Sequence, residues 1–236
     1  MIKEFDSIGD AERGRIEDVL YTASKFGLNF IPVAGPFLSE LLGFMFANPV
    51  EARRSTFIND LSDHLQSLAE KGLVTMEDLK SNEDFMNVVV NAIPMALRAF
   101  EDDKRVAFRN AILNTAAGHS PDETKTQIFL RTLGELTITH IEVLYYFCNP
   151  AMWYQDHNME MPTNWYTGSL QKAILHAYPK YSDSIEILDI VWEDLKRYGF
   201  HTSGGLRGAM TGDGCFQPRA SLLGQEFMGF ITFKDQ

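Results

Sequence analysis

The side chains best suited to metal binding or proton transfer are scattered along the chain without a recognised spacing. The six histidines are His64, His119, His140, His157, His176 and His201. No two of them form the H-x-x-x-H or H-E-x-x-H pattern that places two metal ligands on one helix face. His140 and Glu142 are two positions apart, and on a helix such side chains diverge by about 200°. We therefore predict no metal site and expect His140 to be a buried or interface histidine.

Residues 151–168, AMWYQDHNMEMPTNWYTG, contain Asp156, His157 and Glu160, which could form a metal or acid–base site in a loop. The segment has no clear period, so it is predicted to be a long loop that packs on the body of the protein. Its aromatic side chains are better explained as a packed flap or a surface for a protein partner. The partner-binding residues predicted on this basis are Trp153, Tyr154, Trp165 and Tyr166.

The glycine-rich stretch GGLRGAMTGDG, residues 204–214, is the one segment that resembles a phosphate-binding loop. It lacks the Walker spacing and the terminal Lys-Ser/Thr, so it is predicted to be a turn. The chain has no G-x-S-x-G elbow, no paired catalytic carboxylates and no kinase motifs. We therefore expect no catalytic residue and no cofactor, and predict that the protein is not an enzyme.

The two cysteines differ in their sequence surroundings. Cys148 follows Tyr145, Tyr146 and Phe147, an apolar context that predicts a buried, protonated thiol. Cys215 is flanked by glycine and is predicted to be the more exposed and more reactive of the two. So few cysteines are typical of a reducing compartment rather than of a disulfide scaffold.

The composition is that of a globular protein. The chain has 236 residues, 45% hydrophobic and 22% charged, which is enough for one large domain or two smaller ones. Its formal net charge of −11 means that the average surface repels nucleic acid and anionic lipid. Residues 1–15 are charged and have no apolar run, so no secretory signal is predicted and a bacterial-type cytoplasm is expected.

Residues 26–50, FGLNFIPVAGPFLSELLGFMFANPV, form the most apolar stretch, and Glu40 is its only charged side chain. A bilayer span needs about 20 apolar residues, but this stretch is interrupted by Pro32, Pro36 and Pro49. We predict a buried helix over 36–46, covered by amphipathic helices over 10–27 and 50–72. The alternative is that the stretch inserts into a membrane, with Glu40 as the membrane or switch residue at a cost of several kcal/mol.

Local signals place the other helices. Thr75 with Asp78, and Ser81 with Asp84, are capping-box-like starts, and the second opens an apolar helix that Pro94 is expected to kink or break. Another helix is predicted to begin at Pro121. The helix from Pro121 is predicted to run to Cys148 in two parts. The other predicted helices span 105–118, 169–177, 183–198 and 221–233, with short strands over 200–203 and 215–219.

The order of elements from residue 136 to residue 236 resembles a winged-helix domain. Three helices, a glycine-rich hairpin and a final helix follow one another, and the stretches DLKRYGFHT and ASLLGQEFMGFI resemble the entry to the wing and the segment after it. The resemblance implies a mainly α protein with two domains. A helical bundle over 1–119 would precede a winged-helix-like domain over 120–236 that carries a small β-hairpin.

In a winged helix that binds DNA, the third helix presents basic and amide side chains to the major groove. Residues 182–199 instead carry five acids against two basic residues, which favours a protein-interaction role. Binding to DNA would have to use Lys196, Arg197, Arg207 and Arg219. Two arginines in the wing neutralise few phosphates, so a nucleic-acid partner is disfavoured.

The middle of the chain, FEDDKRVAFRNAILN and LTITHIEVLYYFCNP, is similar to helical proteins of bacterial abortive-infection and uncharacterised families. The resemblance implies a role in phage defence or stress response and carries over no catalytic residues.

Three functions follow as predictions. The first is a non-enzymatic interaction or regulatory protein that presents its winged-helix-like domain to a protein partner. The alternatives are a membrane-active effector that inserts residues 26–50, and a DNA-binding transcriptional regulator. A homodimer is a further expectation, formed through the apolar surfaces of residues 151–166 or of the helix over 50–72.

Overall fold

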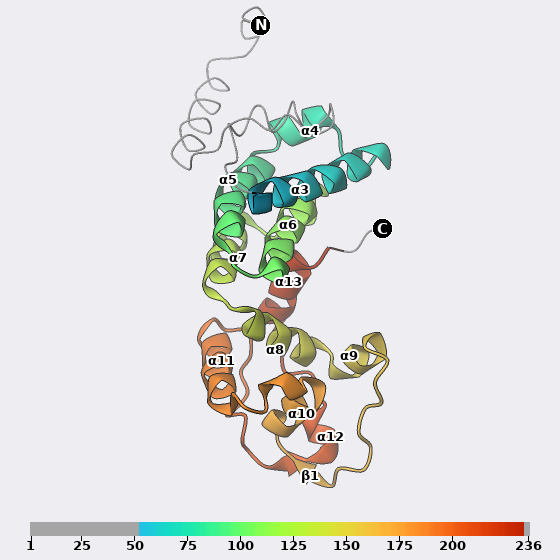
Figure 1. Cartoon of the computed structure of the whole chain (residues 1–236), viewed down its shortest axis with the longest axis vertical. Coiled ribbons are helices and arrows are strands. Elements are labelled where there is room, and N and C mark those ends of the chain that lie inside the picture. The colour runs from blue at the N-terminus through green and yellow to red at the C-terminus, as the bar shows by residue number, and fades with distance from the viewer. Residues whose placement is uncertain (1–51, 234–236) are drawn as a thin grey trace, which may run out of the picture. The chain divides into compact units, whose positions relative to one another are not determined.

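The computed structural model describes residues 52–233 (Figure 1). The predicted helices over 10–27 and 36–46, the apolar stretch 26–50 and Glu40 lie outside the described residues. Eleven α-helices and one two-stranded antiparallel sheet form within 52–233, which confirms the mainly α fold class. The chain divides into two compact units between Leu130 and Arg131, inside α7 (Glu123–Glu135). The division predicted from the sequence was between residues 119 and 120.

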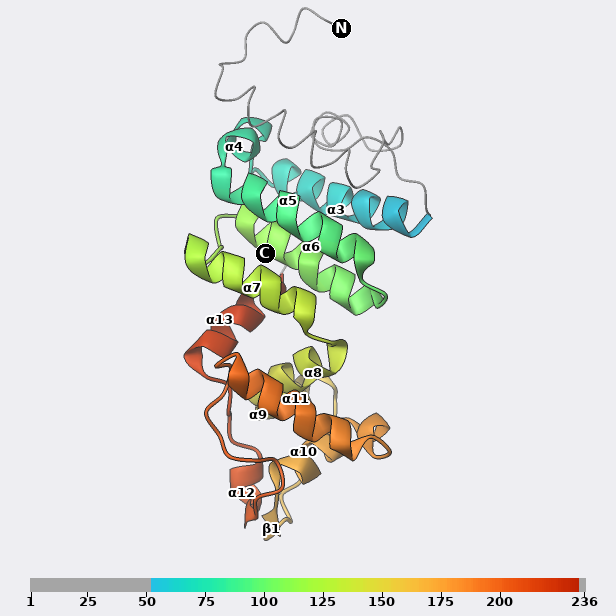
Figure 2. The same cartoon turned by 90° about the vertical axis from the view of Figure 1, so that its left-hand side faces the viewer.

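The N-terminal unit is built from α3 (Ala52–Glu70), α4 (Met76–Ser81), α5 (Glu83–Arg98) and α6 (Asp102–Ala116). Figure 2 shows α3, α5 and α6 lying side by side. The predicted stripe of α3 is buried, and its members are Phe57, Leu61, Leu65 and Leu68. It packs with α5 and α6, whose Phe85, Ile93, Phe108 and Ile112 are fully buried. An apolar stripe on each helix therefore makes one shared core.

Side chains that cap the N-termini determine where α4, α5 and α7 begin. Thr75 and Asp78 form the predicted capping box at α4. The cap of α5 is Asn82 rather than Ser81, because the Asn82 side chain accepts a hydrogen bond from the N–H of Phe85 at 3.0 Å. At α7, Asp122 accepts from the N–H of Lys125 at 3.0 Å, so the helix begins two residues after the predicted Pro121.

The helix α5 runs through Pro94 without the predicted break. Ala92, Ile93 and Ala96 are fully buried on both sides of the proline. Packing of this face against α6 outweighs the helix hydrogen bond that the proline removes. A half-buried ion pair joins α3 to α6 as well, with Asp60 Oδ2 and Arg109 Nη1 2.6 Å apart.

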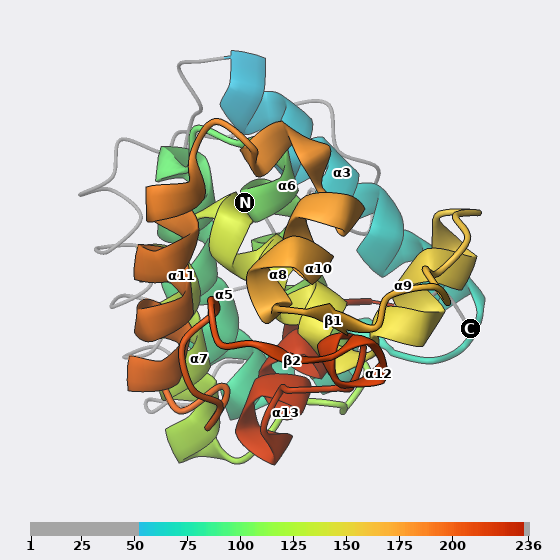
Figure 3. The same cartoon turned by 90° about the horizontal axis from the view of Figure 1, so that it is seen from below.

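The C-terminal unit is organised around α8 (Ile138–Cys148). This helix contacts α9, α10, α11 and α13 (Figure 3). The unit's further elements are α9 (Pro150–Asp156), β1 (Thr167–Gly168), α10 (Leu170–Ala177), the 3-10 turn η2 (Pro179–Tyr181), α11 (Ile185–Arg197), β2 (Met210–Thr211), α12 (Gly212–Cys215) and α13 (Leu222–Ile231). The predicted helices over 169–177, 183–198 and 221–233 match α10, α11 and α13 within two residues at each end.

The helix α9 lies where the sequence predicted the start of a long loop. Asn149 caps it by accepting a hydrogen bond from the N–H of Met152 at 3.1 Å, and Pro150 occupies the first turn, where its missing N–H costs nothing. Pro150 therefore starts a helix as well as following the end of α8. Seven residues are too few to show a helical period, so the sequence pattern did not reveal this helix.

The predicted hairpin between 200–203 and 215–219 is reduced to a single antiparallel bridge, His201 with Ala220. The sheet instead pairs β1 with β2, with Thr167 opposite Thr211 and Gly168 opposite Met210. A small antiparallel pair is therefore present, but its position was predicted wrongly. Two residues per strand carry no alternation, and contacts far apart in the sequence hold the pair in place.

Gly212 lets the chain pass close to the backbone of Trp165 and Tyr166, beside the β1–β2 pair. Gly212 donates its N–H to the carbonyl of Tyr166 at 3.2 Å. A Cβ atom on residue 212 would lie 1.7 Å from the carbonyl oxygen of Trp165. Only glycine fits this position, because the obstructing atom belongs to the backbone.

The segment 219–221 ties the end of α8 to the residues that follow α11. The carbonyl of Phe147 accepts the N–H groups of Arg219 at 2.8 Å and Ala220 at 3.1 Å. Ser221 donates its N–H to the carbonyl of Phe200 and its hydroxyl to the carbonyl of Gly199, both at 2.7 Å. The same Ser221 hydroxyl accepts from the N–H of Gly224 at 3.1 Å and so caps α13.

Candidate protein-interaction face

Two of the four predicted partner-binding aromatics lie in the core of the C-terminal unit. Trp153 is 2% exposed and Tyr154 is 1% exposed. The Trp153 indole N–H donates to the hydroxyl of Tyr178 at 2.8 Å, and the Tyr154 hydroxyl lies 2.8 Å from Nδ1 of His176. These partners satisfy the polar ends of both rings, so the two side chains stabilise the fold and present no surface to a partner.

The other two aromatics, Trp165 and Tyr166, come immediately before β1. Trp165 is half-buried against Phe216 and His176, and the ammonium group of Lys172 lies 3.9 Å from the centre of its ring. Tyr166 is 94% exposed. Of the four predicted residues, Tyr166 alone projects fully into solvent.

The structure does not gather the four predicted nucleic-acid contacts into a free basic patch. Arg207 forms a two-pronged ion pair with Asp189, and Arg197 pairs with Asp194 at 3.0 Å. Arg219 is half-buried and donates from Nη2 to the carbonyl of Gly214 at 2.7 Å. The three arginines are therefore bound to acids or a carbonyl within the unit. Lys196, the fourth predicted residue, is exposed.

The surface that stands out is the outer side of α11. The inner side is buried through Leu188, Val191, Trp192 and Leu195. On the outer side, Ile187 is 52% exposed and Ile190 is 62% exposed, one turn apart. We define the α11 face as Glu186, Ile187, Asp189, Ile190 and Glu193. The sequence offered a signal for it, because Ile187 and Ile190 fall outside the apolar stripe of α11.

Acids surround the exposed Ile190. Its helical neighbours three and four positions away are Glu186, Ile187, Glu193 and Asp194. Asp194 is engaged by Arg197 and by Nε2 of His140, 3.5 Å from its Oδ2. Within residues 52–233, the side chains of Glu186 and Glu193 form neither a hydrogen bond nor an ion pair. The face therefore joins an exposed apolar centre to two carboxylates that form no close ion pair among the described residues, although Arg207 interacts with Glu186 at longer range.

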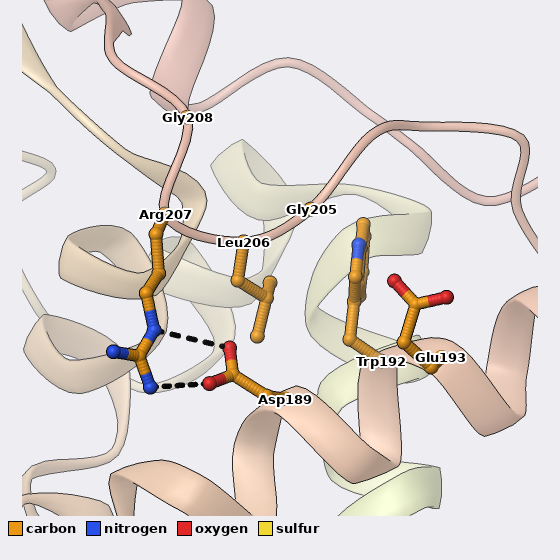
Figure 4. Close-up of a pocket in the computed structure, with 7 residues that line it drawn as sticks. All are labelled: Asp189, Trp192, Glu193, Gly205, Leu206, Arg207 and Gly208. Carbon is orange, nitrogen blue, oxygen red and sulfur yellow. Dashed lines mark hydrogen bonds and ion pairs between the residues drawn. The ribbon is translucent and has the colours of Figure 1, made fainter.

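A small pocket adjoins the α11 face (Figure 4). Its volume is about 360 Å³, and it lies between α11 and the loop Gly205–Gly208. The Trp192 indole N–H donates to the carbonyl of Gly204 at 2.7 Å and so holds this loop against the helix. Figure 4 shows the Leu206 side chain between Trp192 and the Asp189–Arg207 pair. Trp192 and Leu206 thus give the pocket an apolar floor, and Glu193 is on its rim.

His201 supports the pocket from inside the unit. Its ring stacks on Trp192 with centroids 3.6 Å apart, and its Nε2 lies 2.7 Å from the Trp192 carbonyl. A carbonyl only accepts, so Nε2 carries the hydrogen and Nδ1 does not. Nδ1 is buried and has no hydrogen-bond partner among the described residues. Burial lowers the pKa of His201, since a second proton would be placed on this enclosed atom.

This arrangement predicts a pH dependence of stability that His201→Gln should reduce. The unfolded chain binds a proton at His201 below about pH 6.5, its ordinary pKa, whereas the folded chain resists it. The free energy of unfolding should therefore fall as the pH falls below about 6.5. Urea unfolding at about pH 7.5 and about pH 5.5 measures the decline. Equal declines in the wild type and in His201→Gln would contradict the assignment, because the other histidines are common to both proteins.

The other candidate groups for chemistry are engaged in structural contacts. Cys148 is half-buried rather than fully buried as predicted, and its burial raises its pKa to about 12. Cys215 is fully buried in α12, which corrects its predicted exposure, and burial also raises its pKa. His140 is buried as predicted, with Nδ1 2.8 Å from the hydroxyl of Thr137. His157 stacks on Trp153, and the Tyr145 hydroxyl donates to Asp156 at 3.1 Å.

Residues 52–233 contain no group of three or more His, Cys, Asp or Glu side chains placed to hold a metal ion. No helix in this part of the chain is both long enough and apolar enough to cross a membrane. Comparisons of the chain with protein-family models, with curated proteins and with solved structures find no match.

Proposed function

We propose that the protein is a non-enzymatic interaction or regulatory protein that binds a protein partner through the α11 face. The observation that carries the proposal is Ile190, an isoleucine 62% exposed at the centre of a helix face. A second exposed isoleucine, Ile187, is one turn away, and two other residues of the α11 face, Asp189 and Glu193, line the pocket. An apolar centre with a polar rim is the usual anatomy of a protein interface.

A winged-helix-like arrangement of the C-terminal unit is part of the proposal. It is supported by the order of α8, α10 and α11, followed by the glycine-rich loop and α13. In this arrangement α11 takes the place of the third helix. Its acids favour a protein over DNA, and Arg207, in the glycine-rich loop, is paired with Asp189. Salt-dependent duplex binding that is lost in Arg207→Glu would favour DNA instead.

The bacterial setting implied by the sequence resemblance, phage defence or stress response, belongs to the same proposal, and the identity of neighbouring genes tests it. The membrane-active alternative concerns residues 26–50 and stays a prediction. Leakage of vesicles by the purified protein, and its loss in Glu40→Lys, would support that alternative.

Ile190→Asp is the variant that tests the proposed function. Partners captured by the intact protein from its native cell extract should be lost with this variant, and the purified partner should bind it at least about 10-fold more weakly, since interface centres cost about 2 kcal/mol or more when disrupted. Leu222→Asp is the matched control, because Leu222 is 73% exposed on α13 and outside the face. A partner that binds the wild type, Ile190→Asp and Leu222→Asp equally would overturn the proposal. Thermal unfolding of each variant verifies that it is folded.

A further inference from the structure

We infer that the partner segment received by the α11 face is a basic amphipathic helix with two Lys or Arg side chains seven positions apart and apolar side chains between them. The inference rests on the proposed function and specifies the chemistry of the partner. It follows from the spacing of charges on α11, from the pocket at one end of the face and from the exclusion of a second copy of the chain.

The spacing comes from Glu186 and Glu193. They are seven residues apart, which on an α-helix is two turns, or about 10.5 Å along the axis, on the same side. Both side chains are exposed, and neither forms a hydrogen bond or a close ion pair within the described part of the chain. Arg207, whose guanidinium is held by Asp189, interacts with Glu186 only at longer range. Two basic residues at i and i+7 of a partner helix have the same separation. The exposed Ile187 and Ile190 then meet the partner's positions i+3 and i+4, which are on the same helix face.

The pocket explains why a long basic side chain suits the Glu193 end. Lys and Arg lay their aliphatic stems on apolar surface while the charged group stays at a polar rim. Trp192 and Leu206 form the floor of the pocket, where 1% and 2% of their surface is exposed, and the Glu193 carboxylate supplies the rim charge. Asp189, the other acid lining the pocket, is already paired with Arg207. Glu193 is therefore the acid that is left for a cation from the partner.

A second copy of the chain fits this face poorly. Two α11 faces in contact would place the carboxylates of Glu186 and Glu193 against one another, and such like-charge contacts suppress association. The whole chain carries a formal net charge of −11, so its average surface also repels another copy. Charge complementarity therefore selects a basic protein segment.

A defined peptide provides the test. The probe is a helical peptide of about 18 residues, long enough to be helical in water, with Arg at i and i+7 and Leu at i+3 and i+4. One control replaces both Arg residues by citrulline, which has the same shape without the charge. A second control moves one Arg to i+5, on another side of the helix. Affinity for the full-length protein is measured by calorimetry at low and high salt.

The expected result is binding of the i, i+7 peptide that weakens with salt and falls at least about 10-fold for both control peptides. The double variant Glu186→Gln/Glu193→Gln should lose binding to the same extent. Glu77→Gln/Glu160→Gln is the matched control, because it removes the same charge from exposed acids on other segments and should bind normally. Equal binding of the citrulline peptide, full binding by the Glu186/Glu193 variant or no binding of the i, i+7 peptide would overturn the inference.

The two proposals fail in different ways. A captured partner that needs Ile190 but binds Glu186→Gln/Glu193→Gln normally would overturn the basic-helix inference and leave the proposed function standing. A captured partner that binds Ile190→Asp normally would overturn the proposed function, and the basic-helix inference would fail with it.

Discussion

Gly212→Ala is expected to lower the free energy of unfolding of the C-terminal unit by about 3 kcal/mol or more. The added Cβ would lie 1.7 Å from the carbonyl oxygen of Trp165 and 2.7 Å from its carbonyl carbon. No side-chain rotation relieves such a clash, because the obstructing atoms belong to the backbone. The chain must separate at this point, which breaks the hydrogen bond from Gly212 to Tyr166 and disrupts the β1–β2 pair.

Tryptophan fluorescence in a urea titration measures this effect. The three tryptophans, Trp153, Trp165 and Trp192, all belong to the C-terminal unit, so their emission reports on that unit. Gly208→Ala is the control, since a Cβ there meets its nearest atom, the carbonyl oxygen of Gly205, at an ordinary 3.7 Å. Equal unfolding midpoints for Gly212→Ala and Gly208→Ala would contradict the prediction.

Trp192→Ala is expected to cost about 3–5 kcal/mol of the same free energy of unfolding. Trp192 is among the largest fully buried side chains, and its ring stacks on His201 and packs against Phe147 with centroids 4.9 Å apart. Its indole N–H also holds the carbonyl of Gly204, so the substitution leaves a cavity and a carbonyl without its donor. The loop at the pocket should loosen, and binding at the α11 face should weaken with it.

Trp192→Phe separates the two contributions. It keeps most of the ring and removes the indole N–H, so it should cost about 0.5–1.5 kcal/mol, the net contribution of a typical hydrogen bond, because water can reach the exposed Gly204. The fluorescence of Trp153 and Trp165 follows unfolding in both variants. Equal losses in Trp192→Ala and Trp192→Phe would show that packing of the ring contributes little.

Local chemistry made much of the fold predictable. Thr75 with Asp78 caps α4 as predicted, and Ser169 and Ser221 cap α10 and α13, the helices predicted over 169–177 and 221–233. A capping side chain bonds to a backbone N–H only two or three residues away, so such starts are visible in the sequence. The acidic outer side of α11 could be predicted too, since charged positions alternate with the buried stripe of Leu188, Val191 and Leu195.

The role of the aromatic residues could not be predicted from the sequence. Trp153 and Tyr154 were expected at a partner surface, yet both are buried. An aromatic side chain with a polar end suits a core and an interface equally well, and the choice depends on distant partners such as Tyr178 and His176. The pocket depends in the same way on a tertiary contact, between Trp192 and the loop at Gly204.

The strands were mislocated for a related reason. Cys215 was predicted to begin a strand and is instead in the short helix α12, which Thr211 caps by accepting from the N–H of Gly214. The pairing of Thr167 with Thr211 brings together residues far apart in the sequence. Neither β1 nor β2 contains a sequence pattern from which its partner strand could be predicted.

The ties made by residues 219–221 have a consequence for synthesis on the ribosome. The carbonyl of Phe147, at the end of α8, receives its two backbone donors from Arg219 and Ala220, and His201 receives its bridge partner from the same segment. While the chain is being translated, α8, α10 and α11 emerge before these donors exist. The C-terminal unit therefore cannot complete its hydrogen bonding until residues 219–231 have left the exit tunnel, whereas residues 52–130 already have their core.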